Sequence, residues 1–158
     1  MILIIGYGNP LRRDDGVGWA VIESVLAQAS PDMTCLAVHQ LTPELSEGVA
    51  NADLVILIDA SAEGEAGYIH VTPILPSQDN IPIMTHHLSP RGLLDMAQWL
   101  YGKTPFTLLI TITGADFGLG EGLSDIVKGK VASLVNVILW CATNAHHADL
   151  TKPPQDML

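Results

Sequence analysis

The chain has 158 residues, of which 48% are hydrophobic and 15% are charged, and its formal net charge is −10. This composition excludes a disordered chain and predicts one domain with a well-packed core. The negative charge repels phosphate backbones and anionic lipid, so we expect no nucleic acid and no membrane among the partners.

The predicted elements alternate along the chain. Short aliphatic runs predict strands at residues 2–6, 33–38, 54–59, 68–72 and 106–113, and helical patterns lie at 16–29, 43–51, 90–101 and 124–145. This order predicts an α/β fold, a three-layer αβα arrangement with a mostly parallel twisted sheet of about five strands and helices on both faces. We expect residues 1–148 to form a single domain and residues 149–158 a flexible C-terminal tail.

The first apolar run, residues 1–7, lacks a basic segment before it and is predicted to be a strand rather than a secretory signal. The longest apolar stretch, residues 131–143, is shorter than the roughly 20 residues needed to cross a bilayer. The two cysteines, Cys35 and Cys141, form no C-x-x-C pair, which favours a reducing, cytoplasmic compartment and a chain without a disulfide framework or a cysteine zinc site.

A glycine-rich loop joins the first strand to the first helix. A dinucleotide site fits it poorly, because Leu11 stands where the third glycine of G-x-G-x-x-G belongs and two acids stand where pyrophosphate would lie. Those acids are Asp14 and Asp15. We expect one of them to cap the helix, as carboxylates at a helix start do, and the other to project into the crevice.

A third acid, Asp59, ends the apolar run 54–59. The carboxyl end of a buried parallel strand faces the edge of the sheet where ligands bind. If the first and third strands are neighbours, Asp15 and Asp59 lie on one crevice. Two acids there would bind a cation or share a proton.

Two adjacent histidines, His86 and His87, precede the helix predicted from Pro90. One imidazole with two carboxylates and an open position suits nickel, zinc or iron. The sequence leaves open which of the two histidines is the ligand. The remaining histidines all have adequate structural interpretations, and they are His39, His70, His146 and His147.

Taken together, these segments resemble the hydrogenase maturation protease family over nearly the whole chain. The resemblance rests on the strand that ends at Asp59, the His86 loop, the turn at residues 120–124, the motif His-Gln-Leu-Thr-Pro-Glu-Leu at 39–45, and the opening pattern Gly6-x-Gly8-Asn9-x-Leu11-x-x-Asp14-Asp15-Gly16-x-Gly18. The motif at 39–45 looks more like the proteases that serve bidirectional, NAD(P)-linked hydrogenases.

The resemblance implies an endopeptidase that removes the C-terminal extension of a nickel-loaded [NiFe] hydrogenase large-subunit precursor. It implies that Asp15, Asp59 and His86 are both the metal ligands and the catalytic residues, and that the substrate supplies the nickel, the resting enzyme being metal-free. A monomer in the cytoplasm is the corresponding expectation. The alternatives are a non-catalytic nickel-binding chaperone that uses the same three ligands and a small nucleotide-binding α/β domain.

Overall fold

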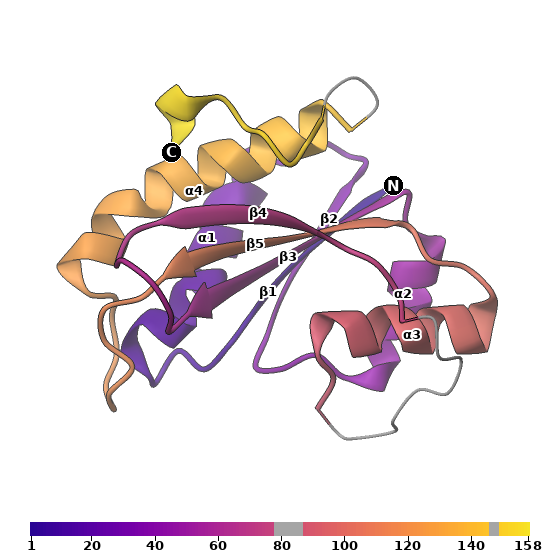
Figure 1. Ribbon diagram of the computed structural model, residues 1–158, viewed down its shortest axis with the longest axis horizontal. Helices are drawn as coiled ribbons and strands as arrows, with labels where there is room; N and C mark the ends of the chain where they lie inside the picture. Colours follow the sequence, from indigo (N-terminus) through magenta and orange to yellow (C-terminus); the bar gives the residue numbers. More distant parts are fainter. Residues whose placement is uncertain (78–86, 146–148) are drawn as a thin grey trace.

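Five strands form one twisted sheet in the order β2-β1-β3-β5-β4 (Figure 1). The computed structural model describes residues 1–77, 87–145 and 149–158. Neighbouring strands are parallel except for β4, which runs antiparallel to β5 at one edge. The strands are β1 (Ile2–Tyr7), β2 (Met33–Val38), β3 (Leu54–Ser61), β4 (Ile69–Ile74) and β5 (Phe106–Thr113).

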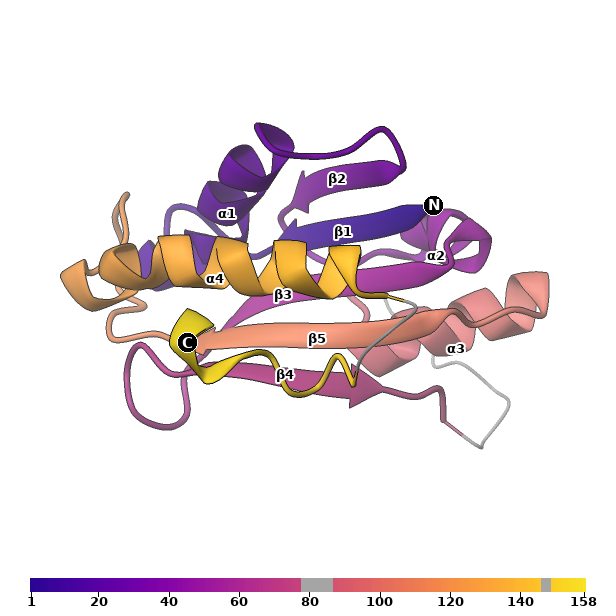
Figure 2. The same cartoon turned by 90° about the horizontal axis from the view of Figure 1, so that it is seen from above.

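Helices cover both faces of this sheet, which confirms the predicted three-layer αβα class. Helices α1 (Val17–Leu26) and α4 (Asp125–Thr143) contact each other on one face, while α2 (Ser46–Asn51) and α3 (Pro90–Tyr101) contact each other on the other (Figures 1 and 2). Three short 3-10 helices complete the described chain, at Arg13–Gly16, Pro43–Leu45 and Gln155–Met157.

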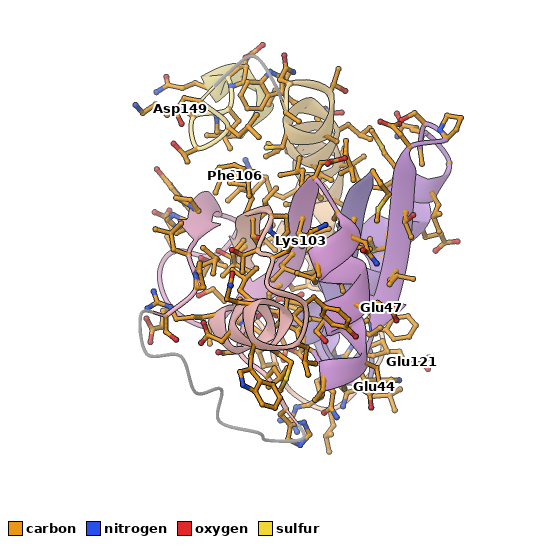
Figure 3. All side chains as sticks on the ribbon, turned by 90° about the vertical axis from the view of Figure 1, so that its right-hand side faces the viewer. Glu44, Glu47, Lys103, Phe106, Glu121 and Asp149 are labelled. Atoms are coloured by element: carbon orange, nitrogen blue, oxygen red, sulfur yellow. The ribbon has the colours of Figure 1, made fainter. Side chains whose placement is uncertain are left out.

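The central strands β1 and β3 are buried on both faces because their side chains alternate between two apolar clusters. Ile4 and Ile56 belong to the cluster beneath α1 and α4, whereas Ile5 and Leu57 belong to the cluster beneath α2 and α3. Seen from the edge where the parallel strands begin, side chains fill the layers on both sides of the sheet (Figure 3). This double burial explains why both strands are continuous apolar runs in the sequence.

Capping residues set the bounds of helix α3 where the sequence predicts them. The Ser89 hydroxyl accepts a hydrogen bond from the Gly92 N–H at 3.0 Å, and Gly102 ends the helix in the left-handed region at φ 67°. The helix predicted at 43–51 is instead divided into a 3-10 turn and α2. Thr42, which precedes the 3-10 turn, makes no side-chain cap bond.

Helix α4 is, within the described residues, the one helix that is long and apolar enough to cross a membrane. Its buried side chains, including Leu134, Ile138 and Cys141, belong to the core cluster beneath α1 and α4, as expected for the core helix of a globular domain. Residues 149–158 lie along this helix. Leu150 is buried there, and Lys130 Nζ donates to the Leu158 carbonyl at 2.9 Å, while the flexibility expected of this tail stays a prediction.

Candidate active site

The turn after β1 folds back tightly onto the loop that carries the first two acids. Gly8 has φ +137°, and a Cβ placed on it would lie 2.0 Å from the Asp15 carbonyl oxygen, so only glycine fits this approach. The Asn9 N–H donates to Asp15 Oδ2 at 2.7 Å. The glycine-rich turn therefore serves to fix Asp15 at the carboxyl edge of the sheet.

Asp59 lies on the strand next to this turn, as the sequence analysis anticipates. Strands β1 and β3 are paired up to Gly6 and Ile58, which places Tyr7 and Asp59 at the next position of the register. By alternation, both side chains lie on the face covered by α2 and α3. The Ala60 N–H donates to Asp59 Oδ1 at 2.8 Å.

The electrostatics of Asp59 include a contribution from Asp15. The pKa of Asp59 is raised from 3.8 to about 6, because burial and, to a smaller extent, the negative charge of Asp15 raise it more than the interactions with Tyr7 and Ala60 lower it. A partly buried carboxyl group with a raised pKa beside a second acid is an arrangement typical of catalytic and metal-binding sites.

Tyr7 is a site residue that the sequence reasoning missed. It lies next to Asp59 in the strand register, and its pKa is raised first by burial and then by its interactions with Asp59 and Asp15. The alternation of side chains along β1 contains the signal that could have identified Tyr7. Tyr7 follows Leu3 and Ile5 on the same face of β1, at the point where the strand reaches the edge.

Asp14, the neighbour of Asp15, has a structural task that differs from the predicted cap. Neither acid makes a side-chain cap bond to the helices that follow it, so the expectation that one of them caps is wrong. Asp14 is wholly buried, and it accepts hydrogen bonds from the N–H groups of Ala115, Asp116 and Ser124 and from the Ser124 hydroxyl at 2.7–3.0 Å. Burial alone would raise its pKa, but these bonds hold the pKa below its usual value.

The glycine turn at residues 118–124 lies against the acid-bearing loop. The Arg13 N–H donates to the Gly120 carbonyl at 3.1 Å, and Arg13 Nη1 donates to the Glu121 carbonyl at 2.8 Å. Gly120 in turn donates to the Leu11 carbonyl at 2.9 Å. The loops that follow β1 and β5 are therefore fastened to each other beside the acids.

The predicted third ligand, His86, lies outside the described residues. His87 is described and exposed, and its neighbour Leu88 donates from its N–H to the Leu41 carbonyl at 3.0 Å. Within residues 1–77, 87–145 and 149–158, no three His, Cys, Asp or Glu side chains gather closely enough to hold a metal ion. Of the three residues predicted for the site, the structure therefore describes Asp15 and Asp59, and their role stays a prediction.

His39, at the end of β2, keeps the structural interpretation given to it. It is exposed, and its ring lies 5.1 Å from that of Trp19 at an interplanar angle of 55°. Trp19 Nε1 donates to the Gly8 carbonyl at 2.9 Å. The pair therefore supports the turn after β1 from the outside.

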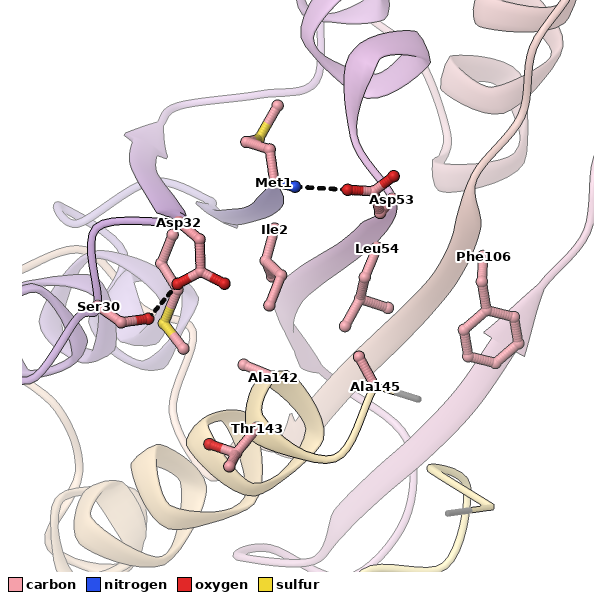
Figure 4. A pocket seen from close by; sticks show the side chains of 11 residues that line it. Met1, Ile2, Ser30, Asp32, Asp53, Leu54, Phe106, Ala142, Thr143 and Ala145 are labelled. Atoms are coloured by element: carbon pink, nitrogen blue, oxygen red, sulfur yellow. Dashed lines mark hydrogen bonds and ion pairs between the residues drawn. The ribbon is translucent and has the colours of Figure 1, made fainter. Parts of the chain in front are cut away.

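A hollow of about 500 Å³ lies at the opposite edge of the sheet (Figure 4). It is lined by the first residues of β1, β3 and β5 and by the end of α4, and the Met1 amino group bonds to Asp53 within it. Ligands of open α/β sheets bind at the carboxyl ends of the strands, where Asp15 and Asp59 lie. We therefore assign the chemistry to the acid pair and not to this hollow.

Comparison with known proteins identifies solved structures that share this fold. No protein-family model and no curated protein sequence matches the chain. The [NiFe] hydrogenase maturation protease HycI from Thermococcus kodakarensis is 26% identical, with a TM-score of 0.72 over 90% of this chain and 92% of that one. The hydrogenase maturating endopeptidase HybD from E. coli is 24% identical, with a TM-score of 0.70 over 92% and 93%. An endopeptidase from Escherichia coli is 23% identical, with a TM-score of 0.73 over 92% and 93%.

The fold, the acid pair at its carboxyl edge and these likenesses define an α/β protein of the endopeptidase class. Among solved structures the chain resembles the hydrogenase maturation proteases, which are peptide hydrolases.

Proposed function

We propose that this chain is an endopeptidase that removes the C-terminal extension of a nickel-loaded [NiFe] hydrogenase large-subunit precursor. The observation that carries the proposal is the placement of Asp15 and Asp59 at the carboxyl ends of the neighbouring strands β1 and β3, in a fold shared with proteins named for hydrogenase maturation. The motif at residues 39–45 favours a bidirectional, NAD(P)-linked hydrogenase as the source of the precursor. The free cysteines Cys35 and Cys141 are compatible with the cytoplasm as its site of action.

The two acids are suited to a metal that arrives with the substrate. In the absence of a cation, Asp15 and Asp59 repel each other, and this repulsion contributes to the raised pKa of Asp59. A nickel ion seated in the precursor would remove the repulsion on docking, with His86 as the proposed third ligand. A precursor without nickel would leave the acids unpaired and costly to desolvate, so metal insertion would act as a checkpoint before cleavage.

Once docked, the precursor would present its scissile peptide to a water molecule beside the site. Either the nickel activates this water as a Lewis acid or a site carboxylate takes its proton as a general base. Asp59, with a pKa of about 6, is largely ionised at neutral pH and can serve as that base. Both routes use the same residues.

The intact mass of the precursor tests this proposal. Incubation with catalytic amounts of wild-type protein should remove a C-terminal peptide from the nickel-loaded precursor and leave the nickel-free precursor unchanged. Asp15→Ala and Asp59→Ala should be inactive, whereas Asp156→Ala, which removes an exposed acid near the C-terminus, should cleave normally. An unchanged mass together with nickel-dependent binding of the precursor would favour the chaperone alternative.

The nucleotide-binding alternative has less support from the site. In a nucleotide-binding loop, backbone N–H groups point at the phosphates. Here the Asn9 N–H is already bonded to Asp15, whose negative charge would repel a phosphate group.

A further inference from the structure

Two leucines are exposed on the fastened loops that follow β1 and β5. Leu11 is 54% exposed and Leu119 is 80% exposed, although the backbone on either side of them is held by hydrogen bonds. Single exposed apolar side chains are common on protein surfaces, but those that lie together mark an interaction site. The question is therefore whether the two leucines lie together.

A backbone bridge brings these leucines to neighbouring positions. Arg12 and Gly120 form an isolated parallel bridge, in which the Gly120 N–H donates to the Leu11 carbonyl at 2.9 Å and the Arg13 N–H donates to the Gly120 carbonyl at 3.1 Å. In this parallel register, the residue before Arg12 lies beside the residue before Gly120, and these residues are Leu11 and Leu119. The two loops lie side by side in both ribbon views (Figures 1 and 2).

Asn9 connects this place to the predicted acid site. Its side-chain carbonyl accepts a hydrogen bond from the Leu11 N–H at 2.9 Å, and its own N–H donates to Asp15 Oδ2 at 2.7 Å. Leu11 and Asp15 are four residues apart in the sequence, so their Cα atoms lie within about 14 Å of each other, the span of about four extended residues of a substrate. A peptide that reaches Asp15 can therefore also reach the leucines.

We infer that Leu11 and Leu119 form an apolar docking pair for the hydrogenase precursor, which receives an apolar side chain of the substrate near the segment that docks at Asp15. The inference rests on the proposed function and adds two specificity-determining residues to it. Because the two loops are fastened to each other, the docking pair is preorganised, and binding costs little ordering of these loops.

The occupant is the precursor and not a second copy of this chain. The docking pair includes a residue of the loop that carries Asp15, and a dimer built over this loop would cover the acid that the substrate must reach. Burial of a leucine side chain against a partner is favourable because it removes apolar surface from water. The docking pair thus adds affinity for the polypeptide of the precursor to that for its nickel.

The variants Leu11→Ser and Leu119→Ser test the docking pair, because serine removes apolar surface at positions that are already open to solvent. We expect each variant to unfold within a few degrees of the wild type and to raise the KM for nickel-loaded precursor about 10-fold, with kcat little changed. Leu119→Met, which keeps an apolar side chain, should recover most of the lost affinity. Leu26→Ser is the matched control, because Leu26 is 55% exposed and lies at the far end of α1 from Asp15.

Kinetics and binding together separate this inference from the proposed function. If wild type cleaves the precursor, a KM of both serine variants equal to that of wild type, or a loss confined to kcat, would overturn the docking pair and leave the protease standing. If wild type never cleaves, the protease activity is refuted, and calorimetry with nickel-loaded precursor decides. Weaker binding by Leu119→Ser than by Leu26→Ser would then support the docking pair, whereas equal binding, or no binding by wild type, would refute it.

Discussion

Two adjacent aspartates at the start of α1 have separate tasks. Asp14 is wholly buried and takes four hydrogen bonds from the segment 115–124, whereas Asp15 takes one from Asn9 and raises the pKa of Asp59 by its charge. Both residues are aspartates, so their different tasks arise from the side of the loop on which each carboxylate lies. One acid fastens the fold and the other belongs to the site.

Replacement of the two acids should therefore separate stability from activity. Asp14→Ala leaves three backbone N–H groups without their acceptor, and we expect it to lower the free energy of unfolding by about 3 kcal/mol or more. Asp15→Ala should lower it by less than about 1 kcal/mol and abolish cleavage. Urea unfolding and the precursor mass assay measure the two effects. The reverse pattern would contradict the assignment.

The raised pKa of Asp59 has a consequence for the stability of the metal-free protein. Its pKa is about 6 when folded and 3.8 in the reference state, so the folded chain binds the proton more tightly. As pH rises from about 4 to 6, the unfolded chain is favoured, and the penalty stays constant above that range. We expect Asp59→Asn to be more stable than wild type by about 1–3 kcal/mol near pH 7.5 and by much less near pH 4. Urea unfolding at both pH values measures this, and a gain that is equal at the two would refute the assignment.

The sequence nominates Asp15 and Asp59 because a carboxylate in the loop after one strand and a carboxylate at the end of another are visible as a pattern. It could not predict Tyr7, whose part depends on the pairing of β1 with β3 and on the face to which its ring turns. It also could not separate Asp14 from Asp15, because the partners of Asp14 lie more than 100 residues away in the sequence. His86 stays a prediction.

At the scale of elements, the loops after β1 and β5 form one fastened pair. Arg12 and Gly120 form an isolated parallel bridge, and Arg13 adopts a positive φ of 50° beside it. The pairing holds the start of α4 next to the loop that carries Asp15. The close position of the turn 118–124 against the loop after β1 therefore explains why this turn contains glycines.

We expect a side chain at position 120 to destabilise the protein. It has φ +140°, and a Cβ there would lie 2.7 Å from the Arg13 guanidinium, so we expect Gly120→Ala to destabilise by about 1–3 kcal/mol. Gly129 is the control, since it lies within α4 with no atom within 4 Å of an added Cβ. Gly129→Ala should stabilise by about 0.5–1 kcal/mol. Thermal unfolding of both variants compares them, and equal shifts would contradict the strained turn.

Element positions were predicted to within a few residues, and the errors have physical causes. Strand β3 continues past Asp59 to Ser61 because β5 pairs with it up to Thr113. Helix α1 ends at Leu26, before residues 27–29, which the pattern had included. The ends of strands and helices depend on contacts with distant residues, which a local sequence pattern does not contain.

At the scale of the molecule, the alternation of strands and helices was sufficient to predict the three-layer class. It did not predict the order of the sheet or the reversed direction of β4. That strand has a mixed exposure pattern and lies at the edge, where an antiparallel neighbour needs no helical crossover. Topology of this kind is set by long-range pairing.

The net charge of −10 predicts a salt dependence for the proposed reaction. If the extension of the precursor is basic, long-range attraction should speed its encounter with the protein, and added salt should screen it. We expect kcat/KM to fall several-fold between about 0.05 M and 0.5 M NaCl. A precursor carrying an acidic extension is the control, and equally strong cleavage of it in high salt would contradict electrostatic attraction.

The fastening by Asp14 makes the site and the last helix one cooperative unit. The N–H groups of Ala115, Asp116 and Ser124 all end on a single buried carboxylate of the first loop. None of the three can open to solvent without exposing that charge, so their hydrogen exchange with deuterium should proceed at one common, slow rate. The exchange of these three amides would then report how often the site comes apart in the native protein.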